Sequence, residues 1–156
     1  MNRASIVHPE LAKASFGLAV EPLLVHGHLF AKEGIRLVRY EFPLLDLELT
    51  WTTRGQPIRL RVDGEDFPYR PINGWWTDEA GRRLSTGIPN GAGFHTANPD
   101  GTPRAWFCWL GWAGFHDHPS HQDTSWAAVR DDKDYRVVPL LQRLVRALNG
   151  PGVQIA

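Results

Sequence analysis

Apolar and polar residues alternate along three consecutive segments, residues 34–45, 45–53 and 57–64. An alternation with period two is typical of β-strands that bury one face and expose the other to water. The connections between these segments are short, so we expect an antiparallel meander, with a fourth strand over residues 71–77. The residues expected to face the core are Ile35, Leu37, Tyr40, Phe42, Leu45, Leu47, Leu49, Trp51, Ile58, Leu60 and Val62.

Helical patterns flank the predicted strands. A helix is expected over about residues 9–20, because Pro9 suits the first helical position and Pro22 should prevent continuation. A second helix is expected over residues 137–150, where a glycine and a proline form a stop. Its apolar face consists of Leu140, Leu141, Leu144, Val145 and Leu148.

The region between the strands and the last helix shows no sustained periodic pattern of apolar and polar residues. Residues 78–101 are rich in Gly, Pro, Asn and Asp, which build turns, so we expect a long loop there, and such loops are usually functional. A short apolar segment, 105–112, and a polar loop, 115–126, follow. At roughly 100–200 residues per domain, the sequence predicts one α+β domain spanning residues 1–156.

Composition and charge exclude several classes of function. The chain has 17 Lys and Arg and 17 Asp and Glu, so no basic field favours nucleic acid or an anionic membrane. Its apolar stretches are far shorter than the ~20 residues that span a bilayer. His8, Glu10 and Lys13 stand where a signal peptide needs apolar residues. We therefore expect a cytoplasmic protein that binds neither nucleic acid nor membrane and uses no cofactor.

Cys108 is the only cysteine, which rules out an intramolecular disulfide and a multi-cysteine zinc site. In one interpretation it is a small apolar core residue between Phe107 and Trp109. In the other it is a nucleophile for acyl transfer, because a thiol can accept an acyl group from another thioester without a dedicated activating dyad. Acyl transfer also needs donors that stabilise an oxyanion, and the preceding polar loop offers Asn98 and His95.

Both of these loop residues have structural alternatives. Asn98 begins the run Asn98-Pro99-Asp100-Gly101, which is a strong turn signal. For His95, a backbone hydrogen bond that braces the loop is favoured over proton transfer. The two roles of Asn98 remain open at this point.

Three local motifs occur in a fixed order along the chain. Residues 67–71 read FPYRP, residues 95–108 read HTANPDGTPRAWFC, and Trp126 precedes the last predicted helix and its Gly-Pro end. They resemble the Tyr-Pro-x-x-Pro element, the His-Pro-Asn stretch before the catalytic cysteine, and the tryptophan and final helix of the ubiquitin-conjugating enzyme (UBC-like) superfamily. The predicted order of elements is similar to the fold of that family over nearly the whole chain.

The sequence also departs from the family pattern. Residues 95–99 read HTANP in place of a contiguous His-Pro-Asn, and the stretch from Cys108 to Trp126 is longer than in the family. In these departures the chain resembles divergent bacterial relatives encoded in antiphage operons, including CBASS and ubiquitin-like conjugation operons.

The resemblance implies a function as well as a fold. It implies that Cys108 carries a partner protein's C-terminus as a thioester and transfers it to an amine, with Asn98 beside the oxyanion. The implied partner is a ubiquitin-like protein or the C-terminus of a cGAS-like nucleotidyltransferase, in bacterial antiphage defence. We expect no adenylating domain in the chain, so a partner such as an activating enzyme would supply the activated acyl group.

The loop after Cys108 suggests a rival function. Its potential ligands are His116, Asp117, His118, His121 and Asp123. The spacing His-x-His-x-x-His could present three imidazoles to Zn²⁺ and leave the fourth position to water, as in a zinc-dependent hydrolase. The same loop could instead be a solvated insertion, or could orient the substrate or accept a proton during amine attack. A third hypothesis is a non-catalytic UBC-like binding module, although the family hallmark of such modules is a missing cysteine.

Overall fold

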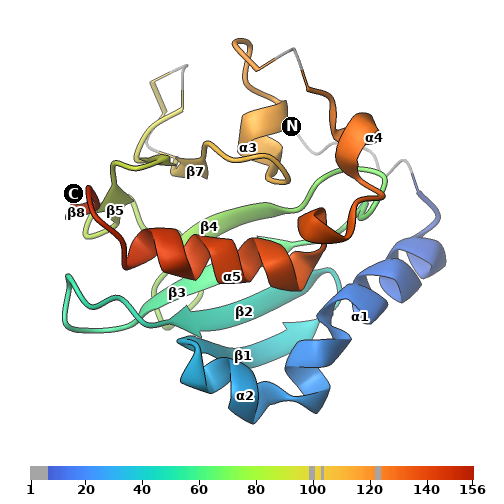
Figure 1. Ribbon diagram of the computed structural model, residues 1–156, viewed down its shortest axis with the longest axis horizontal. Helices are drawn as coiled ribbons and strands as arrows, with labels where there is room; N and C mark the ends of the chain where they lie inside the picture. The colour runs from blue at the N-terminus through green and yellow to red at the C-terminus, as the bar shows by residue number, and fades with distance from the viewer. Residues whose placement is uncertain (1–6, 99–100, 103, 122–123) are drawn as a thin grey trace.

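The computed structural model describes residues 7–98, 101–102, 104–121 and 124–156 (Figure 1). In chain order the elements are α1 Pro9–Val25, α2 Gly27–Lys32, β1 Ile35–Glu41, β2 Leu44–Leu49, β3 Ile58–Asp63, β4 Asn73–Thr77, β5 Pro89–Asn90, β6 Phe94–His95, β7 Trp106–Phe107, α3 Ala113–His116, α4 Trp126–Val129, the 3₁₀ turn η1 Lys133–Tyr135, α5 Val137–Leu148 and β8 Gln154–Ile155. The fold is α+β, as predicted. Among the described residues, no helix combines the length and the apolar character needed to cross a membrane.

The main sheet confirms the predicted meander. Its strand order is β1-β2-β3-β4, and all three neighbouring pairs are antiparallel. A register shift just after Leu37 forms a bulge in β1, which is why the next inward-facing residue is Tyr40. The residues predicted to face the core are all buried or partly buried. The opposite face carries charged pairs between strands, such as Arg61 and Asp46 at 2.8 Å.

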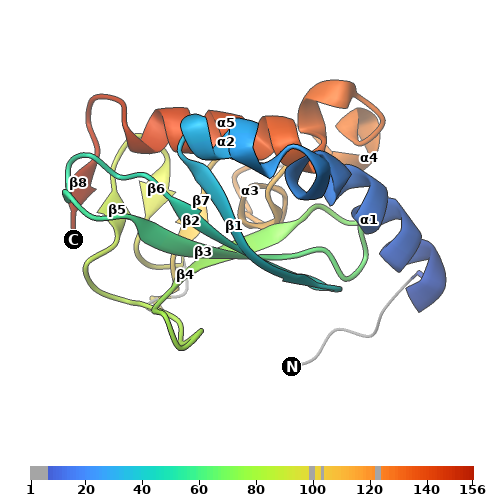
Figure 2. The same cartoon turned by 90° about the horizontal axis from the view of Figure 1, so that it is seen from below.

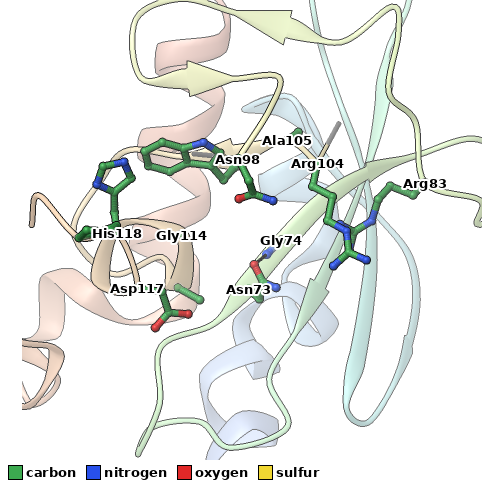
Figure 3. A pocket seen from close by; sticks show the side chains of 12 residues that line it. Asn73, Gly74, Arg83, Asn98, Arg104, Ala105, Gly114, Asp117 and His118 are labelled. Carbon is green, nitrogen blue, oxygen red and sulfur yellow. Dashed lines mark hydrogen bonds between the residues drawn. The ribbon is translucent and has the colours of Figure 1, made fainter. Parts of the chain in front are cut away.

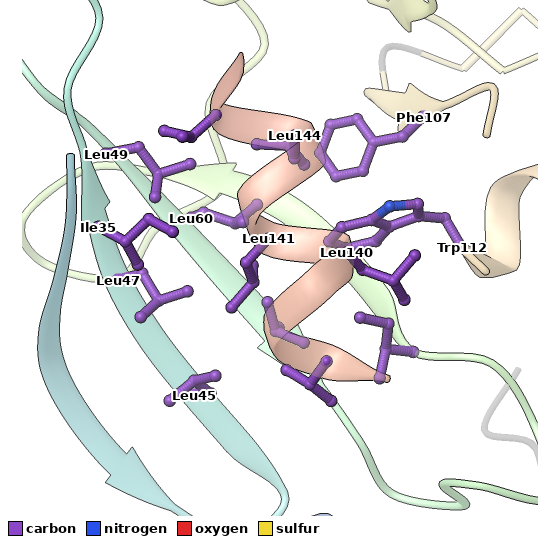
Figure 4. Packing of buried hydrophobic residues seen from close by; sticks show 14 of the residues in the cluster. Ile35, Leu45, Leu47, Leu49, Leu60, Phe107, Trp112, Leu140, Leu141 and Leu144 are labelled. Atoms are coloured by element: carbon purple, nitrogen blue, oxygen red, sulfur yellow. The ribbon is translucent and has the colours of Figure 1, made fainter. Parts of the chain in front are cut away.

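Helices α1, α2 and α5 lie on one face of this sheet (Figure 1 and Figure 2). The predicted apolar face of α5 is confirmed, because all five of its predicted residues are buried. They pack against aliphatic side chains from β1, β2 and β3, as Figure 4 shows. The layer between the helices and the sheet is therefore the main hydrophobic core.

The prediction that Pro22 prevents continuation of the first helix is wrong. Helix α1 contains Pro22 and runs on to Val25. A proline in a helix lacks the N–H that would bond the carbonyl four residues earlier, here that of Leu18. Leu18 is 72% exposed, so water can hydrate that carbonyl, while the buried side chains of Phe16 and Leu23 hold the opposite face on the core.

The middle of the chain is more ordered than the predicted loops. Within residues 78–98, strand β5 pairs with the C-terminal strand β8, and β6 pairs with β7. The predicted polar loop over residues 115–126 includes the end of α3 and the start of α4. Strands of two residues and helices of four carry too little periodicity to be read from the pattern.

Because the core lies between the helices and the sheet, shortening a buried side chain of α5 should destabilise the protein more than shortening an exposed one of α1. Leu141 is fully buried, so Leu141→Ala should lower the free energy of unfolding by about 2–5 kcal/mol, measured by urea denaturation. Leu18→Ala removes the same atoms from an exposed position of α1 and should change it by less than about 0.5 kcal/mol. Equal losses for the two variants would contradict this placement of the core.

Candidate functional site

Cys108 follows β7 and lies beside β4, the last strand of the meander. Its backbone N–H donates to the carbonyl of Gly93 at 2.8 Å, and the N–H of Ala113 donates to the carbonyl of Ile72 at 2.8 Å. These bonds attach the cysteine segment, residues 108–113, to the residue before β6 on one side and to the residue before β4 on the other. The thiol itself is only partly buried. The fold therefore holds Cys108 at the edge of the core.

Two glycines make this close packing possible. A Cβ atom on Gly74 would lie 2.8 Å from the ring of Trp112, and one on Gly93 would lie 2.6 Å from the ring of Trp109. Gly93 also has a φ of +97°, a conformation that glycine adopts readily and other residues rarely do. A side chain at either position would displace an indole next to the cysteine segment.

The thiol of Cys108 is paired with the imidazole of His121. Its Sγ atom lies 3.2 Å from His121 Nε2. Burial raises the pKa of the Cys108 thiol, so the sulfur keeps its proton at neutral pH and can donate it to Nε2. An imidazole at this distance is within reach of the proton that a general base would remove. The pair has the geometry of a nucleophile with an adjacent base.

Stacked rings hold His121 in position. The ring of His121 stacks on the ring of Phe115, with the centroids 4.0 Å apart. Its centroid also lies 5.1 Å from that of the His118 ring. His118 and His95 both stack on the indole of Trp106, at 4.9 and 4.3 Å. Burial lowers the pKa of His95, and the nearby imidazoles of His118 and His121 lower it further. The ring of His95 thus packs on the indole of Trp106, and the backbone hydrogen bond expected for His95 stays a prediction.

Asn98 takes part in a local turn. Its Nδ2 donates to Thr102 Oγ1 at 3.3 Å, and the N–H of Gly101 donates to the Asn98 carbonyl at 2.8 Å. This geometry agrees with the turn alternative, although Pro99 and Asp100 of the predicted turn lie outside the described residues. The role of Asn98 at the oxyanion stays a prediction.

The three histidines of the hypothetical zinc loop serve different partners. His116 Nε2 accepts a hydrogen bond from a backbone N–H at 3.0 Å, and His118 Nδ1 lies 2.7 Å from the hydroxyl of Ser120. The third, His121, is paired with the thiol. In the part of the chain that the structure describes, no group of three or more His, Cys, Asp or Glu side chains is arranged to hold a metal ion, and Asp123 lies outside that part.

Two of the motifs noted in the sequence contact each other. The indole Nε1 of Trp126 donates to the carbonyl of Pro68 at 2.7 Å, although the two residues are 58 positions apart. Trp126 is buried, so this bond is shielded from water. The bond fixes Trp126, the last residue of the polar loop over residues 115–126, relative to the segment before β4.

His121 also borders a cavity of about 880 Å³ with an acidic wall. Asp63, Glu65 and Asp66 contribute carboxyl groups to that wall. The pKa of Asp63 is raised, mainly by burial and in addition by the charges of Glu65 and Asp66. Arg70, which pairs with Asp66 at 3.3 Å, and Arg130 line the same cavity, so its charges are mixed.

Sequence reasoning missed the specific pairing of Cys108 with His121. It considered His121 as a zinc ligand or a proton acceptor in an unplaced loop. The two residues are 13 positions apart and no periodic element joins them. The available signal was chemical, because a lone thiol followed by several imidazoles is the composition of a nucleophile with a base.

Comparison of the sequence with protein-family models and with curated proteins gave no match.

Proposed function

We propose that this chain is a cysteine-dependent acyl transferase of the ubiquitin-conjugating type. Cys108 would carry the C-terminal acyl group of a partner protein as a thioester and pass it to an amine. The observation that carries the proposal is the 3.2 Å pairing of Cys108 Sγ with His121 Nε2. The α+β architecture, in which a four-stranded antiparallel sheet follows the N-terminal helices and precedes the C-terminal helix along the chain, is compatible with it.

His121 has a task in both steps of this reaction. In the first step Cys108 Sγ attacks the carbonyl of the donor thioester, its proton passes to His121 Nε2, and the donor thiolate leaves and takes up that proton. In the second step an amine attacks the new thioester, the nitrogen loses a proton to His121, and Cys108 leaves as a thiolate that is then reprotonated. The imidazole thus returns to its starting state after each step, as a general base and acid must.

The proposed acyl donor is a ubiquitin-like protein or the C-terminus of a cGAS-like nucleotidyltransferase, in bacterial antiphage defence. A separate activating enzyme would form the first thioester. An amine acceptor is compatible with the cavity beside His121, where Asp63 and Glu65 line the same space as Arg70 and Arg130. The assignment of donor and setting rests on the motifs at residues 67–71, 95–108 and 126.

The transfer step distinguishes this proposal from a simple thioesterase. The protein would be loaded with a short glycine-terminated peptide thioester of mercaptoethanesulfonate, freed of excess donor and mixed with lysine. We expect the loaded peptide to appear mainly as an amide of lysine rather than as the free acid, measured by mass spectrometry. If only the free acid is released, the protein is a thioesterase and the proposed transfer is wrong.

The Asn98→Ala variant tests the oxyanion prediction. If the Asn98 amide stabilises the oxyanion during amine attack, the variant should load normally but discharge to lysine roughly 10²–10³-fold more slowly, in single-turnover measurements. If the amide serves only its bond to Thr102, loading and discharge should fall together, with a stability loss of about 1 kcal/mol in a thermal melt. Only the first result supports a catalytic role.

A further inference from the structure

A second cavity, of about 410 Å³, lies between β4, the segment before β7 and helix α3. Arg83 and Arg104 line it from different segments, on the same side of the cavity in the view of Figure 3. Asn73 lies beside them, and Asp117 lies toward the opposite end. The reaction proposed for Cys108 gives none of these side chains a task.

The two guanidinium groups line one cavity and lie near enough for their charges to interact. Arg83 lies over the ring of Trp75, 4.6 Å from its centroid, and within the described ranges neither Arg83 nor Arg104 forms an ion pair. The adjacent Arg82, by contrast, is paired with Asp78 at 3.0 Å. Burial lowers the pKa of Arg83, and the charge of Arg104 lowers it further. Two like charges held this way favour an anion between them.

The surrounding groups favour a carboxylate. Asn73 Oδ1 accepts the N–H of Gly74 at 2.9 Å, so the amide NH₂ is the end of Asn73 that a ligand in the cavity would meet. The planar fork of a guanidinium matches a carboxylate or a phosphate in two parallel hydrogen bonds. Asp117 lines the same cavity and repels a second negative charge, which favours a singly charged carboxylate over a phosphate dianion.

The cavity shares two walls with the surroundings of the thiol. Trp106 and His118 line it, and their rings stack on each other at 4.9 Å. His118 in turn contacts His121, the partner of Cys108, at 5.1 Å. The imidazoles of His118 and His121 therefore form a chain of contacts from the cavity to the thiol.

We propose that the cavity between Arg83 and Arg104 binds a carboxylate side chain, of aspartate or glutamate, on the protein that docks at Cys108. Assigning the carboxylate to that docking protein rests on the proposed function. The binding of a carboxylate in the cavity does not depend on the thiol chemistry.

The test titrates the protein with N-acetylglutamate amide, with the neutral N-acetylglutamine amide and with inorganic phosphate, and follows the indole N–H signals of Trp75 and Trp106 by NMR. We expect saturable shifts with the glutamate compound and none with the glutamine compound. Arg83→Gln and Arg104→Gln should each weaken binding by about tenfold or more. Trp106 is the reporter for Arg83→Gln, because loss of Arg83 alters the surroundings of Trp75 even without ligand.

Arg82→Gln is the matched control, since it removes the same charge from a neighbouring arginine that already has a partner, and it should change affinity by less than about twofold. Absence of saturation in the unaltered protein, equal shifts with the glutamine compound, or equal effects of all three arginine variants would overturn the proposal. Phosphate binding about tenfold tighter than the carboxylate would also overturn it. The Cys108→Ala variant should bind the carboxylate unchanged, so failure here is distinguishable from failure of the thiol chemistry.

Discussion

Replacement of Cys108 by alanine is expected to reduce acyl transfer from a peptide thioester to lysine to its background rate in solution. Cys108 is the only thiol in the chain, so no other side chain can take over the thioester. Loss of the nucleophile in a protease lowers kcat on the order of 10⁶-fold, and we expect a loss of several orders of magnitude here. The initial rate of lysine acylation at equal protein concentration measures it.

Cys108→Ser provides the companion variant. It keeps the size of the side chain and a hydrogen bond toward His121, but an ester formed on its oxygen would resist cleavage by a thiol reductant. Because Cys108 is only partly buried, both variants should melt close to the temperature of the unaltered protein. Full transfer activity in a folded Cys108→Ala protein would rule out the thiol as the acyl carrier.

The second large effect is expected from His121→Gln. At neutral pH a thiol is mostly protonated, and burial raises the pKa of Cys108 further, so a base that takes up the proton should speed the attack. Loss of the imidazole should slow loading of Cys108 by roughly 10²–10⁴-fold at pH 7. As the pH rises through the raised pKa of Cys108, the thiolate forms without help and the difference between variant and unaltered protein should shrink. The pH dependence of single-turnover loading measures both effects.

His28→Gln is the control for this experiment, because His28 is exposed on α2 and does not belong to the site. Its loading rate should match that of the unaltered protein at every pH. If the loading rates of His121→Gln and of the unaltered protein keep a constant ratio across the pH range, His121 only positions the loop. No change at pH 7 would remove His121 from the mechanism.

The parts of the fold with long patterns could be predicted from the sequence. Strands β2 and β3 each alternate over six residues, and α5 places an apolar stripe on one face over three turns. Each pattern marks an apolar face that must be covered, so the sheet and the helix that packs on it could be predicted from these faces. The end of α1 could not be predicted in this way, because packing of Phe16 and Leu23 on the core outweighs the local effect of Pro22.

The candidate site was predictable only in part. Residue type makes Cys108 a candidate nucleophile, but the sequence left a role as a small apolar core residue equally open. Its partner depends on contacts that leave no pattern in the sequence: the stacking of His121 on Phe115 and the bond from Trp126 to Pro68 that fixes the loop. The sequence spacing of Arg83 and Arg104 likewise does not predict that both line one cavity.

The intact mass of the protein after a brief incubation with the peptide thioester tests the central claim most directly. If Cys108 is an acyl carrier, the mass should increase by one peptide acyl group per chain, and dithiothreitol at neutral pH should remove it. The same incubation of Cys108→Ala should leave the mass unchanged. Acyl groups that resist dithiothreitol and appear equally on Cys108→Ala would contradict the claim, because they would be amides on lysine.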